Sequence, residues 1–555
     1  MCSAIILFLF VISSVVAHDV IVNTKSGRVK GAVEHSFNGT KYFAFHTIRY
    51  AKAPVGALRF QAPVPPDPWT DVYDATTANG AICYQVSFDL TNETEDCLFL
   101  SVYSPNPWKK EKYPVVFHIH GGGFYFGWAD IYGPGYFMDS ARVVVVNINY
   151  RLGPFGFLST QDGVFPGNMG LKDQLLALKW VHENIAAFGG DPDRVTLMGE
   201  SSGATSVDYH ILSPRSAGLF RAAVLLSGTA ISSWASKVDR SDVTFDTAKL
   251  LNSSDFYNVK DTRQLLSKLQ RADAREIDAA SKAYKDGFDQ NRIVKLAELQ
   301  VTYYAAVVEK HNNQPFITER PYESFLKGHY NKVPIFLGMV DEEGLIVMID
   351  DYLWMLDEFD KNNSLLVTET FHIKDRRKLR RVGTLIKQEY SPDTSFQQNH
   401  VGSVKFYTDQ CFQKSILKRA FIDAPRVPVY LYLFTYEGQK ESFHVTIPGA
   451  DNVMHSEDFG YPWEFDNSVN FTKQDKLVKD RMIRILTNFA TFLDPTPKED
   501  PLLQYVRWPT IKNDSNYPYL EIGTDLSIKK NYKQDKFKFW DNLFHNYGEG
   551  PFEVF

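Results

Sequence analysis

Ser201 lies at the centre of the stretch Gly199-Glu200-Ser201-Ser202-Gly203, which directly follows the mostly apolar residues 195–198. A strand that runs into Gly-x-Ser-x-Gly and continues as a helix is typical of a sharp, strained turn that exposes a nucleophilic serine. The flanking glycines let the two backbones pass close together. The same pattern also occurs in ordinary loops, so the prediction depends on the other groups that such a serine needs.

A serine hydroxyl needs a general base, and the base needs a group that orients it. Among 14 histidines, His455 is the candidate base because it lies downstream of the apolar run 429–434. Three adjacent acids, Asp341, Glu342 and Glu343, follow another apolar run. The order serine, acid, histidine is one of the known chain orders of a catalytic triad. The pattern indicates acyl transfer, although composition does not choose among the three acids.

Acyl transfer also needs donors for the oxygen that becomes negative. Three consecutive glycines, Gly121, Gly122 and Gly123, directly follow the apolar run 114–120. Glycines let backbone N–H groups approach a ligand without side chains in between, and Ser202, the residue after the nucleophile, would add another N–H. A flexible turn is the alternative. No metal-ligand spacing and no phosphate-binding loop is found, so we expect neither a metal nor a cofactor.

These residues need a scaffold, and the hydrophobic pattern predicts one. Short apolar runs fall at 114–120, 143–147, 195–198, 222–226, 334–339 and 429–434. Between them, apolar residues recur at helical spacing, as at Leu171, Leu175, Leu178, Val181 and Ile185. Buried strands that alternate with helices predict an α/β fold with a large, mostly parallel central sheet flanked by helices. We interpret residues 236–327 as a helical insertion over the carboxyl edge of this sheet.

Composition and the N-terminus restrict the class of protein. The chain has 555 residues, 44% hydrophobic and 23% charged, with a formal net charge of -6, which does not suggest nucleic acid or an anionic membrane as a partner. Residues 1–17 are uncharged and mostly apolar, and Val15 and Ala17 suit a cleavage site. We expect a secretory signal peptide, with a membrane anchor or a buried strand as alternatives. Residues 18–555 are then expected to form a single secreted catalytic domain without membrane insertion.

The glycosylation sequons and the cysteines are also typical of a secreted protein. The six Asn-x-Ser/Thr sequons predict glycan-bearing surface loops at Asn38, Asn92, Asn252, Asn362, Asn470 and Asn513. Cys83 and Cys97 close a short loop, where a disulfide would contribute about 3 kcal/mol by the chain-entropy estimate. Cys411 is left over, and we interpret it as a buried free thiol rather than a reactive or intermolecular one.

Longer stretches of the chain resemble the type-B carboxylesterase family, which includes cholinesterases and insect carboxylesterases. The resemblance covers nearly the whole mature chain. The motifs that carry it are Leu58-Arg59-Phe60, Glu95-Asp96-Cys97-Leu98, His120-Gly-Gly-Gly-Phe124, Asn149-Tyr-Arg-Leu-Gly-Pro-Phe-Gly-Phe157, Gly167-Asn-Met-Gly-Leu-Lys-Asp-Gln174, Phe188-Gly-Gly-Asp-Pro192, Gly199-Glu-Ser-Ser-Gly203, Asn488-Phe-Ala and Asp494-Pro-Thr-Pro497.

The resemblance implies an α/β-hydrolase fold with a deep gorge and assigns roles to individual residues. It implies Ser201 as nucleophile, His455 as base and Glu343 as the orienting acid. The remaining implied roles are oxyanion donors at Gly122, Gly123 and Ser202, a disulfide between Cys83 and Cys97, ion pairs of Arg59 with Glu95 and of Arg151 with Asp173, and an acyl-pocket wall at Trp234. Ordinary core packing is the alternative for that tryptophan.

Departures from the family's pattern bear on the substrate. The loop between Cys83 and Cys97 has no tryptophan, which argues against the cation–π cage by which cholinesterases bind a quaternary ammonium. Glu200 stands where juvenile hormone esterases usually carry glutamine, and Asn452 replaces their usual glycine. Both weaken the case for that hormone as substrate.

We therefore expect a secreted serine hydrolase that cleaves small to medium, largely apolar carboxylic esters of xenobiotic, pheromone or hormone type through an acyl-enzyme. A monomer or a homodimer is expected. With His455 as an ordinary imidazole, activity should fall as the pH drops through about 6 to 7. The alternatives are a catalytically silent adhesion or scaffold protein on the same fold, and a binder that sequesters ligands with slow turnover.

Overall fold

The computed structural model describes residues 20–86, 90–237, 241–251, 256, 259–290, 303–309, 312–348, 353–438, 445–464 and 471–555. The expected signal peptide and the sequons at Asn252 and Asn470 lie outside the described residues.

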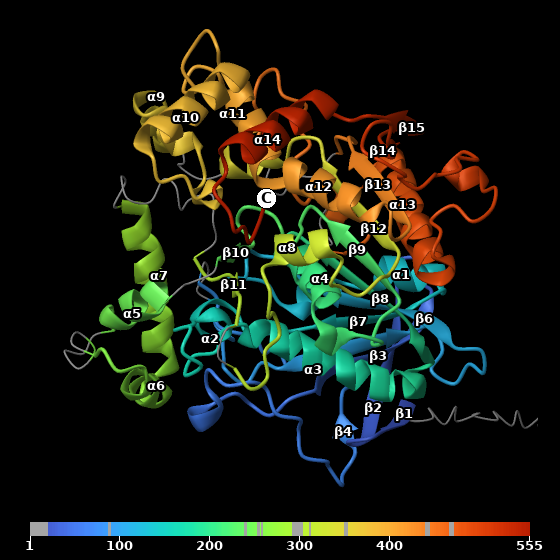
Figure 1. The fold of residues 1–555 in the computed structure, drawn as a ribbon. Helices are drawn as coiled ribbons and strands as arrows, with labels where there is room; N and C mark the ends of the chain where they lie inside the picture. The colour runs from blue at the N-terminus through green and yellow to red at the C-terminus, as the bar shows by residue number, and fades with distance from the viewer. Residues whose placement is uncertain are drawn as a thin grey trace, which may run out of the picture.

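A 13-stranded sheet forms the centre of the molecule (Figure 1). Its strands are β1 (Val20–Thr24), β2 (Gly27–His35), β3 (Lys41–Arg49), β4 (Tyr73–Asp74), β5 (Phe99–Ser104), β6 (Tyr113–Ile119), β7 (Val144–Ile148), β8 (Gly190–Glu200), β9 (Ala222–Leu226), β12 (Ile335–Val340), β13 (Val429–Phe434), β14 (Pro518–Ile522) and β15 (Leu526–Lys530). The order is β1-β2-β3-β5-β7-β6-β8-β9-β12-β13-β14-β15, and β4 pairs with β2. All pairs from β7 to β14 are parallel, so the sheet is mostly parallel, as the apolar runs predict.

Both faces of the parallel strands are buried in apolar clusters. Successive side chains of a strand point to opposite faces, so each strand contributes to both clusters. On β6, Val115, Phe117 and Ile119 belong to one core cluster, and Val116 belongs to the other. The first cluster takes in Leu175 of a long helix on its side of the sheet. Two apolar layers on one sheet explain why these strands read as continuous apolar runs.

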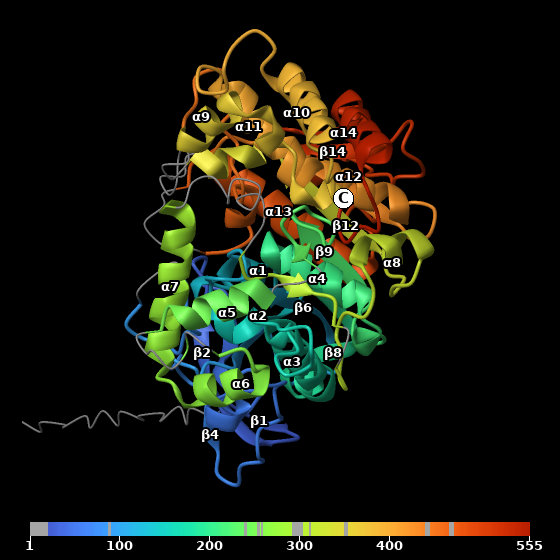
Figure 2. The ribbon, with the colours of Figure 1, turned by 60° about the vertical axis from the view of Figure 1, so that its left-hand side comes forward.

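Helices cover both faces and the ends of the sheet (Figures 1 and 2). They are α1 (Gly135–Ser140), α2 (Gly153–Phe157), α3 (Met169–Asn184), α4 (Ser202–Leu212), α5 (Ser241–Lys249), α6 (Thr262–Arg271), α7 (Ala274–Gln290), α8 (Pro321–Lys327), α9 (Leu353–Lys361), α10 (Arg376–Tyr390), α11 (His400–Tyr407), α12 (Lys414–Asp423), α13 (Lys473–Phe492) and α14 (Gln534–Tyr547). The described part of the chain contains no helix long and apolar enough to cross a membrane.

The helical insertion is held to the sheet by polar contacts as well as packing. Helix α7 contacts α2, which follows the carboxyl end of β7. A short parallel pair, β10 (Ser236–Lys237) and β11 (Ala306–Val307), joins the start of the insertion to its later part. Arg59 donates to the carbonyls of Leu269 and Ala272 at 2.7 Å each, at the end of α6.

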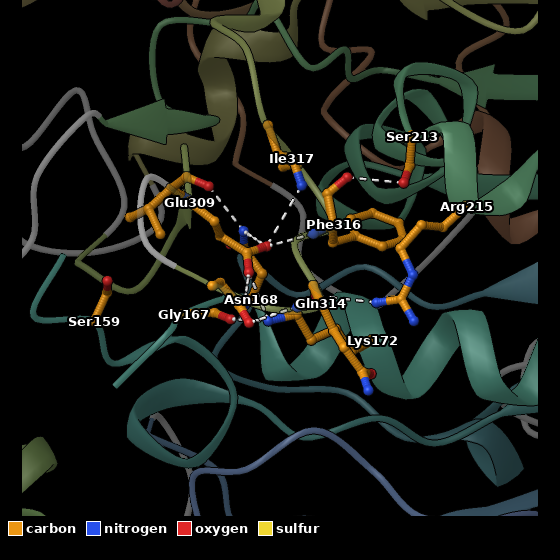
Figure 3. A network of polar contacts seen from close by, with 12 residues as sticks. Ser159, Gly167, Asn168, Lys172, Ser213, Arg215, Glu309, Gln314, Phe316 and Ile317 are labelled. Atoms are coloured by element: carbon orange, nitrogen blue, oxygen red, sulfur yellow. Dashed lines mark hydrogen bonds and ion pairs between the residues drawn. The ribbon is translucent and has the colours of Figure 1, made fainter. Parts of the chain in front are cut away.

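The later part of the insertion is fixed to α3 by a buried polar network (Figure 3). The Lys172 Nζ atom lies 2.7 Å from Glu309 Oε2, and the two side chains are 3% and 0% exposed. Asn168 Nδ2 donates to Glu309 Oε1 at 2.9 Å, and the backbone N–H of Phe316 donates to the same oxygen at 2.8 Å. Asn168 also pairs with the backbone of Val307 in both directions. This network anchors the segment that runs from β11 towards α8.

The ion pairs and the disulfide implied by the resemblance are present. Arg59 donates to both carboxylate oxygens of Glu95 at 2.6 Å, and Arg151 donates to both of Asp173 at 2.7 and 2.8 Å. The Cys83–Cys97 disulfide is formed. Cys411 is a buried free thiol, and burial raises its pKa to about 12, which keeps it protonated and unreactive.

Candidate active site

Ser201 occupies a strained turn between β8 and α4. Its φ and ψ are 56° and -123°, a conformation that non-glycine residues rarely adopt and that is often found at functional sites. The turn is held because the Ser201 N–H donates to the carbonyl of Leu226 at 2.8 Å. A Cβ on Gly199 would lie 2.3 Å from the Gly203 carbonyl carbon, and one on Gly203 would lie 2.2 Å from the Ile119 oxygen. The two glycines of the motif are therefore required by close backbone contacts.

The glycine loop after β6 lies against this turn. A Cβ on Gly121 would come within 3.3 Å of the Ser201 Cβ and 2.6 Å of a Glu200 carboxylate oxygen. Gly122 and Gly123 have φ angles of 101° and 61°, which favour glycine. Among the described residues, neither of their N–H groups donates a hydrogen bond. Two backbone donors beside Ser201 are thus free to bind a ligand oxygen.

The structure selects one of the three adjacent acids as the partner of His455. Glu343 is fully buried, and its Oε2 atom lies 2.5 Å from Nδ1 of His455. Its other oxygen accepts the backbone N–H of Val340 at 3.0 Å, which fixes the carboxylate. Asp341 instead accepts the Tyr532 hydroxyl at 2.6 Å. Glu342 is the third acid.

Glu342 faces the loop that precedes His455. Its carboxylate accepts the N–H of Asn452 at 3.0 Å, and its own N–H donates to the carbonyl of Val453. Asn452 has a φ of 57°, a conformation that asparagine tolerates better than most residues. Asparagine can therefore keep the backbone shape at a position where the resemblance leads us to expect glycine.

The other ring nitrogen of His455 meets Glu200, to which the sequence interpretation gave no part in catalysis. Nε2 lies 3.1 Å from Glu200 Oε1, the same oxygen that accepts the Ser456 hydroxyl at 2.5 Å. Within the described part of the chain, the Ser201 hydroxyl makes no direct hydrogen bond to His455. The structure thus joins His455 to Glu343 and to the neighbour of Ser201, while the third link of the triad is not made. Such bonds often tighten only when substrate binds.

Two carboxylates therefore act on one buried imidazole. Burial alone would lower the pKa of His455, but the charges and hydrogen bonds of Glu200 and Glu343 outweigh it and raise the pKa above its ordinary value. A third buried acid, Asp458, lies nearby and accepts the Tyr432 hydroxyl at 2.5 Å. Burial, with the neighbouring charges of Glu343 and Glu200, raises the pKa of Asp458 to about 7. The pH at which His455 loses its proton therefore lies above the range expected for an ordinary imidazole.

A π-helical turn, Thr408–Gln413, forms a wall beside His455. The Phe412 ring lies 4.7 Å from the His455 ring and 5.9 Å from the Trp234 ring, measured between centroids. The Trp234 Nε1–H donates to the carbonyl of Cys411 at 2.9 Å. The N–H of Gly344, the residue after Glu343, donates to the Thr408 hydroxyl at 2.9 Å. One turn thus contacts the acid's neighbour, the histidine and the tryptophan.

Comparison with known proteins shows the family of the chain. The carboxylesterase family pattern matches residues 18–540. The chain is 33% identical over 509 residues to juvenile hormone esterase of Tribolium castaneum, covering 86% of this chain and 84% of that protein. The chain belongs to the carboxylesterase family.

Further relatives of this carboxylesterase span most of its length. Venom carboxylesterase-6 of Apis mellifera is 32% identical over 550 residues, which cover 94% of each chain. The crystal structure of juvenile hormone esterase from Manduca sexta with OTFP covalently attached superposes with a TM-score of 0.82 at 28% identity, covering 95% of this chain and 100% of that chain. The fold is that of the α/β-hydrolases, as the resemblance implies, and the protein is a carboxylic ester hydrolase.

Two contacts of the carboxylesterase site were missed by sequence reasoning for different reasons. Glu200 was considered only for its bearing on the substrate, although its position beside the nucleophile in the serine motif is a signal that it could lie near the base. Phe412 had no such signal, because its contact with His455 depends on the register of a π-helical turn. The described sequons at Asn38, Asn92, Asn362 and Asn513 are all exposed, and their glycosylation stays a prediction, as does the gorge.

Proposed function

We propose that this carboxylesterase is a secreted serine hydrolase that works through an acyl-enzyme on Ser201. The observation that carries the proposal is the short contact between His455 Nδ1 and Glu343 Oε2, 2.5 Å, next to a serine held in a strained turn. In the first step the Ser201 oxygen attacks the ester carbonyl carbon, and its proton passes to Nε2 of neutral His455. Glu343 orients the ring and stabilises its cation.

The carbonyl oxygen becomes negative and accepts hydrogen bonds from the N–H groups of Gly122, Gly123 and Ser202. The intermediate collapses, His455 gives its proton to the leaving alcohol, and the acyl group stays on Ser201. Water then attacks the acyl-enzyme in the same way and releases the acid. The unused N–H groups of the two glycines support this assignment.

Trp234 and Phe412 are proposed to bound the acyl side of the substrate. The Phe412 ring packs beside the His455 ring, and the Trp234 ring packs beside Phe412. Both side chains are buried. We infer small to medium, largely apolar esters of xenobiotic, pheromone or hormone type. Because two of the similar proteins are juvenile hormone esterases, that hormone is kept among the candidate substrates. Measuring kcat/KM for series of esters that vary separately in acyl and alcohol length would locate the limit that this wall sets.

The change Ser201→Ala tests the mechanism. Triad members act as a unit, so ester hydrolysis should fall by several orders of magnitude. The circular dichroism spectrum and the thermal transition should stay those of the unchanged protein. Substantial remaining turnover in a folded variant would refute Ser201 as nucleophile without touching the family assignment.

One contact favours a second function, the stoichiometric capture of esters with slow turnover. Nε2 of His455 lies 3.1 Å from Glu200 Oε1, and the water that hydrolyses the acyl-enzyme must compete with this contact for the base. Rapid mixing with a chromogenic ester separates the two functions. A burst of one alcohol equivalent followed by almost no steady-state rate would support capture, whereas sustained turnover supports the hydrolase.

A further inference from the structure

Helix α10 carries a dense cluster of arginines on one side. Arg376, Arg377, Arg380 and Arg381 are all exposed, and we call this set the arginine face. Their spacing of i, i+1, i+4 and i+5 places them together over the first two turns. Between residues 374 and 381 the chain has six basic residues and one acid, although its net charge is -6.

The opposite side of α10 packs into the protein. Val382 and Ile386 are fully buried, and Tyr390 is almost so. Both views place the helix at the outer margin of the molecule, beside α11 and α14 (Figures 1 and 2). The arginine face therefore points away from the core.

These charges are poorly matched within the protein. Arg377 lies 4.0 Å from Asp375, and both side chains are strongly exposed, so the pair is worth little. The nearby Glu549 is taken by Lys378 at 2.9 Å. Among the described residues, Arg376 and Arg380 form no ion pair.

Helix energetics disfavour this arrangement. Arg376 with Arg380, and Arg377 with Arg381, are like charges at i and i+4, which destabilise a helix by a few tenths of a kcal/mol per pair. Cations in the first turns also oppose the helix dipole. Lysine would keep the charge, but arginine adds a planar fork of donors that fits sulfate, phosphate or carboxylate groups. The sequence thus keeps four arginines where stability alone would favour neutral or acidic residues.

We propose that the arginine face binds a sulfated polysaccharide chain, with guanidinium N–H groups donating to sulfate oxygens. A narrow linear polyanion can lie along two rows of arginines that repeat about every 6 Å on a helix. Insertion into a lipid surface needs apolar anchors. None of the exposed large hydrophobic side chains of the described residues falls between 353 and 438. A duplex nucleic acid would bring its wide negative surface against a chain of net charge -6.

The test uses the purified full chain and a heparin oligosaccharide as probe, with affinity measured by calorimetry at several salt concentrations. With four contacts, affinity should fall roughly 50-fold between 50 and 200 mM salt, by analogy with single-stranded polyanions. A quadruple variant with Arg376→Gln, Arg377→Gln, Arg380→Gln and Arg381→Gln should lose at least about tenfold in affinity at 100 mM salt.

A matched control loses the same charge elsewhere, at the exposed lysines changed in Lys110→Gln, Lys498→Gln, Lys512→Gln and Lys530→Gln. It should bind heparin nearly as the unchanged protein does. Replacing the four arginines by lysine keeps the charge and should still weaken binding. Ester hydrolysis should be unchanged in every variant, which shows that each is folded and separates this proposal from the catalytic one.

Three results would overturn the proposal. Equal loss of affinity in the arginine variant and the lysine control would show that only net charge matters. Tighter binding to vesicles of phosphatidylcholine and phosphatidylserine than to heparin would assign the face to a lipid surface. Tighter binding to a DNA duplex would assign it to nucleic acid.

Discussion

Two buried clusters of charge in this carboxylesterase differ in how their charges are balanced. In the network on α3, one cation and one anion meet, Lys172 and Glu309, and backbone N–H groups complete the coordination of the carboxylate (Figure 3). In the candidate active site, two carboxylates, Glu200 and Glu343, meet the single ring of His455. The first cluster is neutral overall, and the second carries excess negative charge.

The difference separates a structural cluster from a chemical one. Burial lowers the pKa of Lys172, and the charge and hydrogen bond of Glu309 oppose this effect. Around His455 the carboxylates overcome the effect of burial and raise its pKa. Groups whose pKa values are strongly shifted from their ordinary values are concentrated at functional sites. If the comparison is right, changes in the first cluster should alter stability, and changes in the second should alter rate and pH dependence.

The largest effect is expected for Glu343→Gln. The amide keeps the size of the side chain but cannot stabilise the imidazolium and can favour the wrong tautomer of His455. In a triad this change lowers kcat by about 10³- to 10⁴-fold, equivalent to about 4–5.5 kcal/mol of barrier. Steady-state kinetics with a chromogenic ester would measure it.

Glu342→Gln is the matched control for that change, because Glu342 is the adjacent buried acid and contacts Asn452 rather than His455. Its kcat should stay within about tenfold of the unchanged enzyme, since it removes no contact to the reacting groups. Equal losses in the two variants would show that the structure assigns the acid wrongly.

The sequence predicted the two halves of the site unequally. The serine turn and the glycine loop are marked in the sequence by glycines, because a Cβ on Gly199 or Gly203 would meet backbone atoms and the φ angles of Gly122 and Gly123 are positive. The choice of Glu343 could not be made from composition, because it depends on contacts with residues more than 100 positions away, and it rested on the resemblance. The contacts of Glu200 with His455 and Ser456 likewise join distant segments.

The core of the fold followed closely from the apolar runs, and 222–226 and 429–434 match β9 and β13 in full. The polar anchoring of the insertion did not follow from them. The Lys172 and Glu309 side chains are 137 positions apart, and a charged residue on an amphipathic helix normally predicts an exposed position. Hydrophobic periodicity locates elements but does not reveal which charges pair inside the protein.

The second prediction concerns the neutral cluster. Lys172→Met removes the cation and leaves the carboxylate of Glu309 buried, which should lower the free energy of unfolding by about 3–5 kcal/mol. Urea unfolding followed by tryptophan fluorescence would measure the loss. The acid limb of the pH profile for ester hydrolysis should not move, because no contact to His455 changes.

A double variant, Lys172→Met with Glu309→Gln, removes both charges and keeps the amide oxygen as an acceptor for the N–H of Phe316. It should recover a large part of the lost stability, since the unpaired charge is gone. Stability as low as in the single variant would mean that packing of the lysine stem, not charge balance, holds this segment.

The smallest effect is expected for Glu200→Gln, and it bears most directly on the comparison. The free enzyme needs neutral His455, so kcat/KM falls as the pH drops below the pKa of the ring. Glu200 raises that pKa, so its removal should lower the pKa and shift the acid limb by about 1 to 3 pH units towards lower pH. Glu343 remains and keeps part of the effect. Ser456→Ala is the control, because it removes a hydrogen bond to Glu200 without changing the charge, and its limb should stay in place. The kcat/KM profile is measured from pH 5 to 10 in a folded Glu200→Gln variant. If its acid limb does not move, the Glu200 contact with Nε2 does not affect the pKa of His455. The excess negative charge would then need another explanation.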